Sequence, residues 1–100
     1  MELILMQEKG LIKDLVLQKK YLLVSSQYEP STEVYTRGKN KGRAKRGRLI
    51  EKEISYYADF DYYTKDGEHV VEDAKGVKTK EYIIKRKLML SVHGIRIKEV

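Results

Sequence analysis

Two short strand-like runs separated by a turn sequence constrain the fold of this chain more than any other feature. Aromatic and β-branched residues favour strands, and an Asp-Gly pair favours a tight turn. The chain is therefore predicted to fold back on itself here as a β-hairpin, bringing Asp59 near Asp73 and Lys75. The runs are Tyr57-Ala58-Asp59-Phe60 and Val70-Val71-Glu72-Asp73-Ala74-Lys75-Gly76, and Thr64-Lys65-Asp66-Gly67-Glu68 lies between them.

The turn geometry decides whether the two aspartates share a face of this hairpin. Side chains alternate between faces along a strand, so the register fixes which residues meet. A two-residue Asp66-Gly67 turn would place Asp59 opposite Ala74 and separate it from Asp73. A three-residue Lys65-Asp66-Gly67 loop with the glycine left-handed, or a bulge elsewhere, would place the two aspartates on one face. A shared site requires one of these arrangements.

Two carboxylates and an ammonium on adjacent strands suit metal-assisted hydrolysis of a phosphodiester. Oxygens of Asp59 and Asp73 are hard ligands of the kind that Mg²⁺ or Mn²⁺ prefers, and the backbone carbonyl of Ala74 would add another. A bound metal lowers the pKa of a water, which becomes the nucleophile. Lys75 would orient that water and stabilise charge building on the phosphate. The first hypothesis is therefore a nuclease with Asp59, Asp73 and Lys75 as catalytic residues.

The positive charge of the chain is concentrated in one segment, residues 37–48. The chain carries a net charge of +6 and a pI near 9.4, and this segment has seven basic residues and no acidic one. Its glycines and lack of large apolar residues predict a mobile basic loop or the tip of a hairpin. A solvated loop is the plain alternative, but clustering of one sign favours contact with DNA phosphates. The basic residues are Arg37, Lys39, Lys41, Arg43, Lys45, Arg46 and Arg48.

The remaining pattern predicts an α+β fold in a single domain, residues 1–100. A strand-helix-strand ending implies a right-handed crossover and a mixed sheet. The expected elements are a helix at 1–9 ended by Gly10, strands at 11–24, 33–36, 49–64 and 69–75, and a turn region at 25–31. A second helix is expected at 81–92, with Thr79 as N-cap, Gly94 as stop and an apolar stripe of Ile84, Leu88 and Val92. A closing strand containing Ile95 and Ile97 follows it.

Composition limits where the protein acts. The chain has no cysteine, so it has no disulfide and no thiolate metal site. It also lacks an apolar run of membrane-spanning length, and its N-terminus is a poor secretory signal. We therefore expect a cytoplasmic protein that has no membrane partner.

The hairpin and its flanks resemble a phage-encoded group within the restriction-endonuclease-like, PD-(D/E)xK, superfamily, similar to RecU-type Holliday junction resolvases. The superfamily pattern of an Asp, a spacer, and then Asp or Glu, any residue and Lys falls on Asp59, Asp73 and Lys75. The resemblance extends upstream through Glu8-Lys9-Gly10-Leu11-Ile12-Lys13-Asp14-Leu15 to Gln18, and downstream to a Lys-rich helix with Tyr82, Lys85, Lys87 and Leu88.

This resemblance implies a core with the order helix, three antiparallel strands, helix, strand. It also implies Mg²⁺-dependent cleavage of branched DNA by a homodimer in the host-cell cytoplasm, as part of DNA recombination. The first helix begins partway along the family's helix, so that helix is expected to be truncated. Glu2 is the candidate for its acidic metal ligand, and Gln18 is a candidate residue of the active-site groove.

Several residues carry open alternatives. His69 and His93 lack the spacing of a metal site or a triad, so neither is predicted as a ligand or base. Lys78, Lys85 and Lys87 near the second helix are candidates for DNA contact, although helix lysines are often only solvated.

Two other functions stay open: a catalytically inactive DNA-binding protein of the same fold, and a basic RNA-associated interaction domain.

Overall fold

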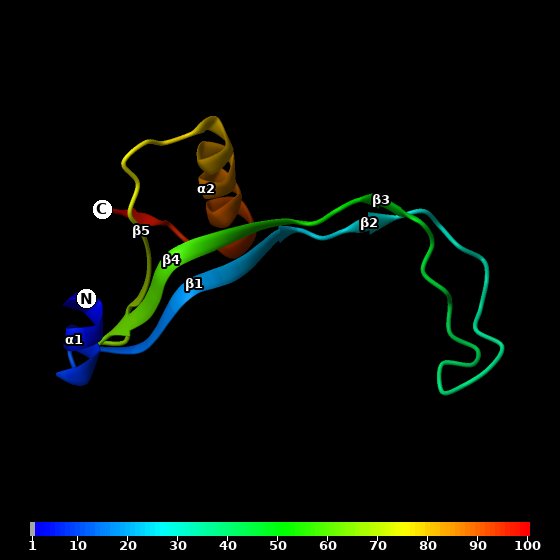
Figure 1. Ribbon diagram of the computed structural model, residues 1–100, viewed down its shortest axis with the longest axis horizontal. Coiled ribbons are helices and arrows are strands. Elements are labelled where there is room, and N and C mark those ends of the chain that lie inside the picture. Colours follow the sequence, from blue (N-terminus) through cyan, green and yellow to red (C-terminus); the bar gives the residue numbers. More distant parts are fainter. Residues whose placement is uncertain (1) are drawn as a thin grey trace. The chain divides into compact units, whose positions relative to one another are not determined.

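A computed structural model describes residues 2–100. The chain divides into two compact units, one built from the residues up to Leu23 and from Ser55 onward, the other from Val24–Ile54. The elements, drawn in Figure 1, are α1 (Glu2–Glu8), β1 (Ile12–Val24), β2 (Gln27–Tyr28), β3 (Leu49–Glu51), β4 (Ile54–Thr64), β5 (His69–Asp73), α2 (Lys80–His93) and β6 (Lys98–Glu99).

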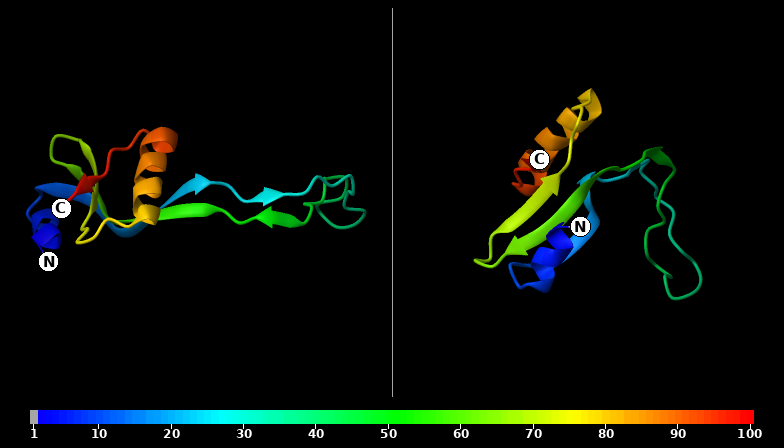
Figure 2. Two further views of the ribbon diagram at one scale, coloured as in Figure 1. Left: turned by 90° about the horizontal axis from the view of Figure 1, so that it is seen from above. Right: turned by 60° about the vertical axis from the view of Figure 1, so that its left-hand side comes forward.

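The first unit contains a four-stranded mixed sheet in the order β1-β4-β5-β6. β4 pairs with β5 antiparallel, whereas β5 pairs with β6 parallel. A parallel pair needs a crossover connection, and α2 supplies it between β5 and β6, as the two views in Figure 2 show. The expected mixed α+β arrangement is confirmed.

The hairpin of β4 and β5 closes through the three-residue loop. The paired positions run from Tyr63 with His69 to Phe60 with Glu72. The backbone N–H of Thr64 donates to the carbonyl of Glu68 at 2.8 Å. Gly67 has a φ of 88°, the left-handed conformation that glycine adopts without a steric penalty. The structure therefore has the three-residue Lys65-Asp66-Gly67 loop, one of the turn geometries that the sequence left open.

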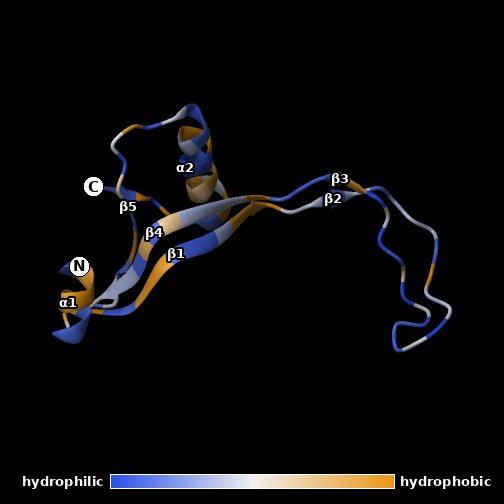
Figure 3. Cartoon of the chain, viewed as in Figure 1, coloured by the Kyte–Doolittle hydropathy of each residue, from blue (hydrophilic) through white to orange (hydrophobic). Residues whose placement is uncertain are grey.

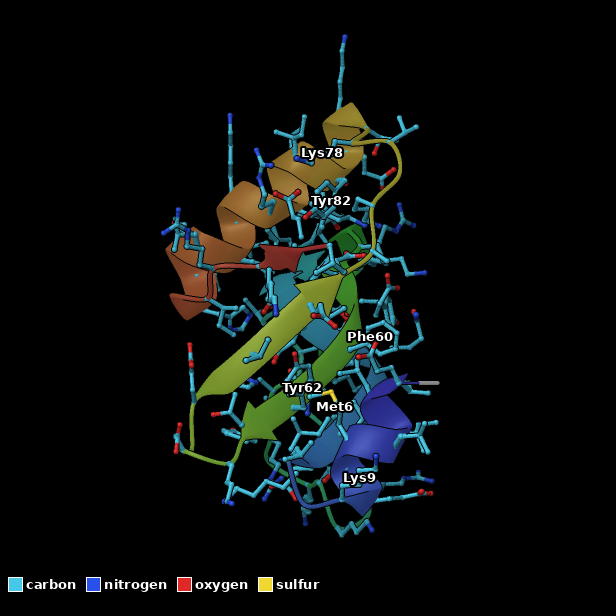
Figure 4. All side chains as sticks on the ribbon, turned by 90° about the vertical axis from the view of Figure 1, so that its left-hand side faces the viewer. Met6, Lys9, Phe60, Tyr62, Lys78 and Tyr82 are labelled. Atoms are coloured by element: carbon cyan, nitrogen blue, oxygen red, sulfur yellow. The ribbon has the colours of Figure 1, made fainter. Side chains whose placement is uncertain are left out.

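The two helices cover opposite faces of this sheet. Met6 of α1 lines hollows together with Tyr62, and one of these hollows also includes Glu72. Figure 4 shows Met6 near Tyr62. Tyr82 of α2 instead packs near Tyr56, with ring centroids 6.4 Å apart, and Tyr56 bonds to Asp73. Because Glu72 and its strand neighbour Asp73 point to opposite faces, α1 and α2 lie on different sides.

Helix α2 begins and ends where its capping residues predict. The Thr79 side chain accepts from the backbone N–H of Tyr82, and Gly94 caps the C-terminus in a left-handed conformation. The expected buried stripe is wrong, however, because Ile84 and Val92 are exposed. The residues of this helix that are buried are Tyr82 and Met89.

The core of the first unit is small and rich in aromatic rings. Its members come from β1, β4, β5, α2 and the segment before β6, whereas α1 contributes no buried residue across Glu2–Glu8. Charged side chains lie among them at Asp61, Glu72 and Asp73. The buried apolar residues are Ile12, Leu23, Tyr56, Ala58, Tyr62, Val71, Tyr82, Met89 and Ile97.

The second unit is a hairpin stem with the basic segment at its tip. β2 pairs with β3 antiparallel, and an isolated bridge joins Val34 to Ala44. A Cβ on Gly47 would lie 2.0 Å from the Glu29 carbonyl oxygen, so only glycine fits there. The turn expected at 25–31 is therefore partly strand, and the expected strand at 33–36 is reduced to that bridge. The tip is coloured mostly as hydrophilic in Figure 3.

The strand expected over residues 49–64 is two strands instead. β3 and β4 are separated at Lys52 and Glu53. The backbone N–H of Glu53 leaves the ladder and donates to the Ser26 hydroxyl at 2.9 Å. Within residues 2–100, no helix has the length and apolarity needed to cross a membrane.

Candidate active site

The hairpin register brings Asp59 and Asp73 to the same face of the sheet. Phe60 pairs with Glu72, so one further step along the ladder places Asp59 opposite Asp73. Directly opposite residues of an antiparallel pair lie about 4.5–5.5 Å apart at Cβ. The arrangement that the nuclease hypothesis required is therefore present.

Asp59 is held by two donors from different parts of the chain. The side-chain amide of Gln18 donates to Oδ1 at 3.1 Å, and the backbone N–H of Ala74 donates to Oδ2 at 3.0 Å. Burial alone would raise the pKa of Asp59, but a hydrogen bond with Asp73, these two donors and the charge of Lys75 outweigh it and lower the pKa. Asp59 is therefore the ionised member of the pair.

Gln18 reaches Asp59 from an unusual backbone conformation. It has a φ of 52°, and Asp14 on the same strand has a φ of 56°. Left-handed backbone is disfavoured for side chains other than glycine, and such strain is concentrated at functional sites. Strand β1 therefore has two local irregularities, and the second lies at Gln18, which was predicted as a groove residue.

Asp73 is fully buried beneath α2 and has one strong partner. The Tyr56 hydroxyl donates to its Oδ2 in a short hydrogen bond. Burial raises the pKa of Asp73 and the neighbouring Asp59 raises it further, while the Tyr56 hydroxyl and Lys75 oppose the rise. Asp73 is therefore the member of the pair that holds a proton most readily.

Lys75 completes the trio from just beyond the end of β5. Its ammonium lies 3.4 Å from Oδ1 of Asp73 and 4.9 Å from the centre of the Tyr82 ring. The Lys75 side chain is 29% exposed, so solvent or a ligand can reach it. An ammonium group that lies between a buried carboxylate and solvent can bind an anion such as a phosphate group.

The donor set fits a hard divalent cation. Oδ1 of Asp73 is buried and makes no hydrogen bond within the described chain, although Lys75 lies at ion-pair distance. A buried carboxylate oxygen without a donor is costly, and a cation would satisfy it and relieve the repulsion from Asp59. Residues 2–100 contain no group of three or more His, Cys, Asp or Glu side chains that could together hold a metal ion. Mg²⁺ needs only one or two carboxylates because it keeps several waters.

The structure does not bring Glu2 to these aspartates. Glu2 lines a hollow with Tyr62, Glu72 and Lys98, on the face of the sheet that α1 covers. The sequence-based prediction of Glu2 as a third metal ligand is therefore not supported by this geometry. Ala74, whose carbonyl was predicted as a further ligand, lies beside the pair, because its backbone N–H donates a hydrogen bond to Asp59.

A second titratable cluster was missed from the sequence. Buried Asp61 accepts a hydrogen bond from the Tyr21 hydroxyl and lies 2.8 Å from Nε2 of His69. The His69 ring stacks on Tyr63, with the ring centroids 4.7 Å apart. His69 is thus not isolated. The hairpin register contained a signal for this cluster, because Tyr63 pairs with His69 and Asp61 lies two residues before Tyr63. The contact from Tyr21 had no local signal.

The other acidic residue of the strand, Glu72, faces away from the aspartate pair. The ammonium of Lys98 lies 3.6 Å from its Oε1, and the Tyr62 hydroxyl donates to the same oxygen at 3.5 Å. Glu72 is therefore paired with a lysine and takes no part in the aspartate pair.

The predicted DNA-contacting cations fall on both units. Near α2, Lys78 lies 3.6 Å from Glu99, and Lys85 lies 3.1 Å from Glu81. Lys87 is exposed. The seven basic residues of segment 37–48 are also exposed, and two of them lie over tyrosine rings, Arg46 over Tyr28 at 4.5 Å and Lys45 over Tyr35 at 5.7 Å. The seven are Arg37, Lys39, Lys41, Arg43, Lys45, Arg46 and Arg48.

Comparison with known families places the chain in one of them. A family model described as "Protein of unknown function (DUF1064)" matches residues 1–98. The chain belongs to the DUF1064 family. No curated protein and no solved structure matches this DUF1064 chain.

Proposed function

We propose that this DUF1064 protein is a metal-dependent DNA endonuclease with a restriction-endonuclease-like core. The observation that carries the proposal is the pairing of Asp59 with Asp73 across the hairpin, with a buried Asp73 oxygen that lacks a hydrogen bond and Lys75 beside it. This is the trio of side chains that metal-assisted cleavage of a phosphodiester needs.

Each side chain has a distinct role in this proposal. Asp59 and Asp73 would hold Mg²⁺ or Mn²⁺, with the Ala74 carbonyl as a further candidate ligand. When bound, the metal lowers the pKa of a water and offsets charge on the phosphate. Lys75 places its ammonium where negative charge builds up during the reaction.

Three further groups prepare the carboxylates. Gln18 and the Ala74 N–H fix both oxygens of Asp59, so that its orientation is set before any ligand arrives. Tyr56 fixes Oδ2 of Asp73 and leaves Oδ1 free of hydrogen bonds. Carboxylates that are already oriented need not rearrange when a metal ion and a substrate bind.

The basic segment at 37–48 supports DNA as the substrate. Its exposed cations can bind phosphates through charge and counterion release, without reading the base sequence. Branched DNA, such as a Holliday junction, and a homodimer are the finer parts of the proposal. Both rest on the resemblance to RecU-type resolvases.

The test is cleavage of end-labelled four-way junctions and matched linear duplexes with Mg²⁺ or Mn²⁺. We expect cleavage of the junction that is lost with EDTA and in Asp73→Asn and Lys75→Ala. Glu68→Gln, an exposed change in the hairpin, serves as the matched control. Tight, salt-sensitive DNA binding without cleavage would instead support an inactive DNA-binding protein. A preference for RNA that ignores both aspartates would support the RNA-associated alternative.

A further inference from the structure

A hollow of about 280 Å³ adjoins the candidate active site on the α2 side. Its walls include Tyr57 of β4, Lys75, and Thr79, Tyr82 and Lys85 at the start of α2. Lys75 also lies 3.4 Å from Asp73, so this one side chain borders both the hollow and the carboxylate pair. A ligand in the hollow would therefore contact a group that the proposed reaction uses.

The chemistry of the walls combines aromatic rings with cations. Tyr57 is 53% exposed, so a large part of its side chain is open to solvent. It lines the hollow together with Tyr56, whose hydroxyl donates a hydrogen bond to Asp73. Lys85 and Lys75 supply positive charge, and Glu81, the acidic residue at this site, lies 3.1 Å from the Lys85 ammonium.

We propose that this hollow is a subsite for one nucleotide of the DNA strand, next to the phosphate at Asp59, Asp73 and Lys75. The base stacks on the exposed ring of Tyr57, and the nucleotide's phosphate meets Lys85. The volume lies near the lower end of small-molecule sites, about 300–1,000 Å³, which suits a single nucleotide. This inference rests on the proposed nuclease function.

An aromatic ring beside two ammonium groups favours a nucleotide over a bare phosphate. A free anion would use the cations alone, and the Tyr57 ring would contribute nothing to its binding. A nucleobase offers a planar face to the ring and carries its own phosphate, so it uses both features at once. Stacking of this type tolerates any base, because every base has a planar face.

The test is a binding scan in EDTA, which prevents metal-dependent cleavage. A fluorescent four-way junction carries a single abasic position, moved one step at a time along the strand through the branch point. Wild type, Tyr57→Ala, Tyr57→Phe and Lys85→Gln are compared, with Tyr63→Ala as the control from the same strand. Circular dichroism confirms that each variant is folded.

We expect Tyr57→Ala to weaken binding of the intact junction about 5- to 150-fold, the range for loss of one stacked base. At one position, loss of the base should weaken junction binding by wild type and by Tyr57→Phe to a similar extent. The same loss should not change binding by Tyr57→Ala, because this variant lacks the ring on which the base stacks. Lys85→Gln should weaken binding and reduce its salt dependence, and Tyr63→Ala should behave as wild type.

The subsite is wrong if every abasic position affects Tyr57→Ala as strongly as wild type, or if wild type binds none of the junctions. Cleavage of the same junctions in Mg²⁺ is measured in parallel. Cleavage without coupling between Tyr57 and an abasic position would overturn the subsite and leave the nuclease proposal intact. Coupling without cleavage would support the subsite and count against catalysis.

Discussion

Replacing Tyr56 with Phe tests how the fold tolerates a fully buried carboxylate. The substitution removes one hydroxyl and keeps the ring, which packs 6.4 Å from Tyr82. Tyr56 is 3% exposed and Asp73 is 0% exposed, so water cannot replace the lost donor. Asp73 would then lose the donor to its Oδ2, and its buried Oδ1 already lacks one.

The expected cost follows from that burial. Hydrogen bonds to charged groups contribute about 1.5–3 kcal/mol, and an orphaned buried acceptor loses that full amount. Burial, and then the hydrogen bond to Asp73, raise the pKa of Tyr56, so its hydroxyl stays a donor across the neutral range. We therefore predict that Tyr56→Phe lowers the free energy of unfolding by about 1.5–3 kcal/mol at pH 9.

The loss should shrink at lower pH. The Tyr56 hydroxyl lowers the pKa of Asp73, so its removal raises that pKa further in the folded state. A folded state that holds its proton more tightly than the unfolded chain loses stability as the pH rises through the window between the two pKa values. The difference between wild type and variant should therefore be small at pH 5 and large at pH 9.

Urea titrations followed by circular dichroism at pH 5, 7 and 9 measure this difference. Tyr57→Phe is the control, because its exposed hydroxyl should change stability by no more than about 0.5 kcal/mol. An equal loss at all three pH values, or no loss at pH 9, would refute the account of Tyr56 and Asp73.

Three further perturbations test other parts of the account. Asp73→Asn should gain stability relative to wild type as the pH rises, because the raised pKa of Asp73 makes its ionisation unfavourable in the folded protein; thermal melts at pH 5 and 8 would contradict this if the two curves shift in parallel. Gln18→Gly should raise the free energy of unfolding by about 1 kcal/mol, because it relieves the left-handed strain, and should slow cleavage, because Asp59 loses a donor. Urea titration measures the first effect and cleavage rates measure the second. An unchanged cleavage rate would show that Gln18 is not part of the site. Replacing the five tip cations Lys39, Lys41, Arg43, Lys45 and Arg46 with Gln should lower the log–log slope of DNA affinity against salt by as much as about 4.5, and an unchanged slope would exclude this segment from the phosphate contacts.

The hairpin could be predicted from sequence because its signals are local. Asp66-Gly67 marks the turn, and counting outward from a three-residue loop fixes Asp59 opposite Asp73. The caps of α2 were equally local, since Thr79 and Gly94 act on backbone groups within one helical turn. The sequence left two turn geometries open, and only the structure decided between them.

The parts that could not be predicted depend on contacts between distant residues. Ile84, Leu88 and Val92 have helical spacing, yet α2 buries Tyr82 instead. The Tyr82 ring packs near Tyr56, and its hydroxyl donates to Glu99 at 2.9 Å. Nothing in the local sequence pattern indicates that this helix buries a polar aromatic residue in place of its aliphatic stripe.

The Asp61 cluster escaped prediction for the same reason. Tyr21 and Asp61 are 40 residues apart, and the short contact from Tyr21 depends on the pairing of β1 with β4. Likewise, the left-handed backbone at Gln18 is a tertiary feature, because a run of strand-forming residues carries no sign of it. Sequence therefore located the two aspartates, and the structure revealed the groups that orient them.

The central claim, that Asp59 and Asp73 together bind a divalent cation, is tested most directly by anomalous diffraction from crystals soaked in Mn²⁺. The account predicts a strong anomalous peak within coordination distance of an oxygen from each aspartate, which disappears in crystals of Asp73→Asn. An absence of anomalous density between the two carboxylates at saturating Mn²⁺ would contradict it.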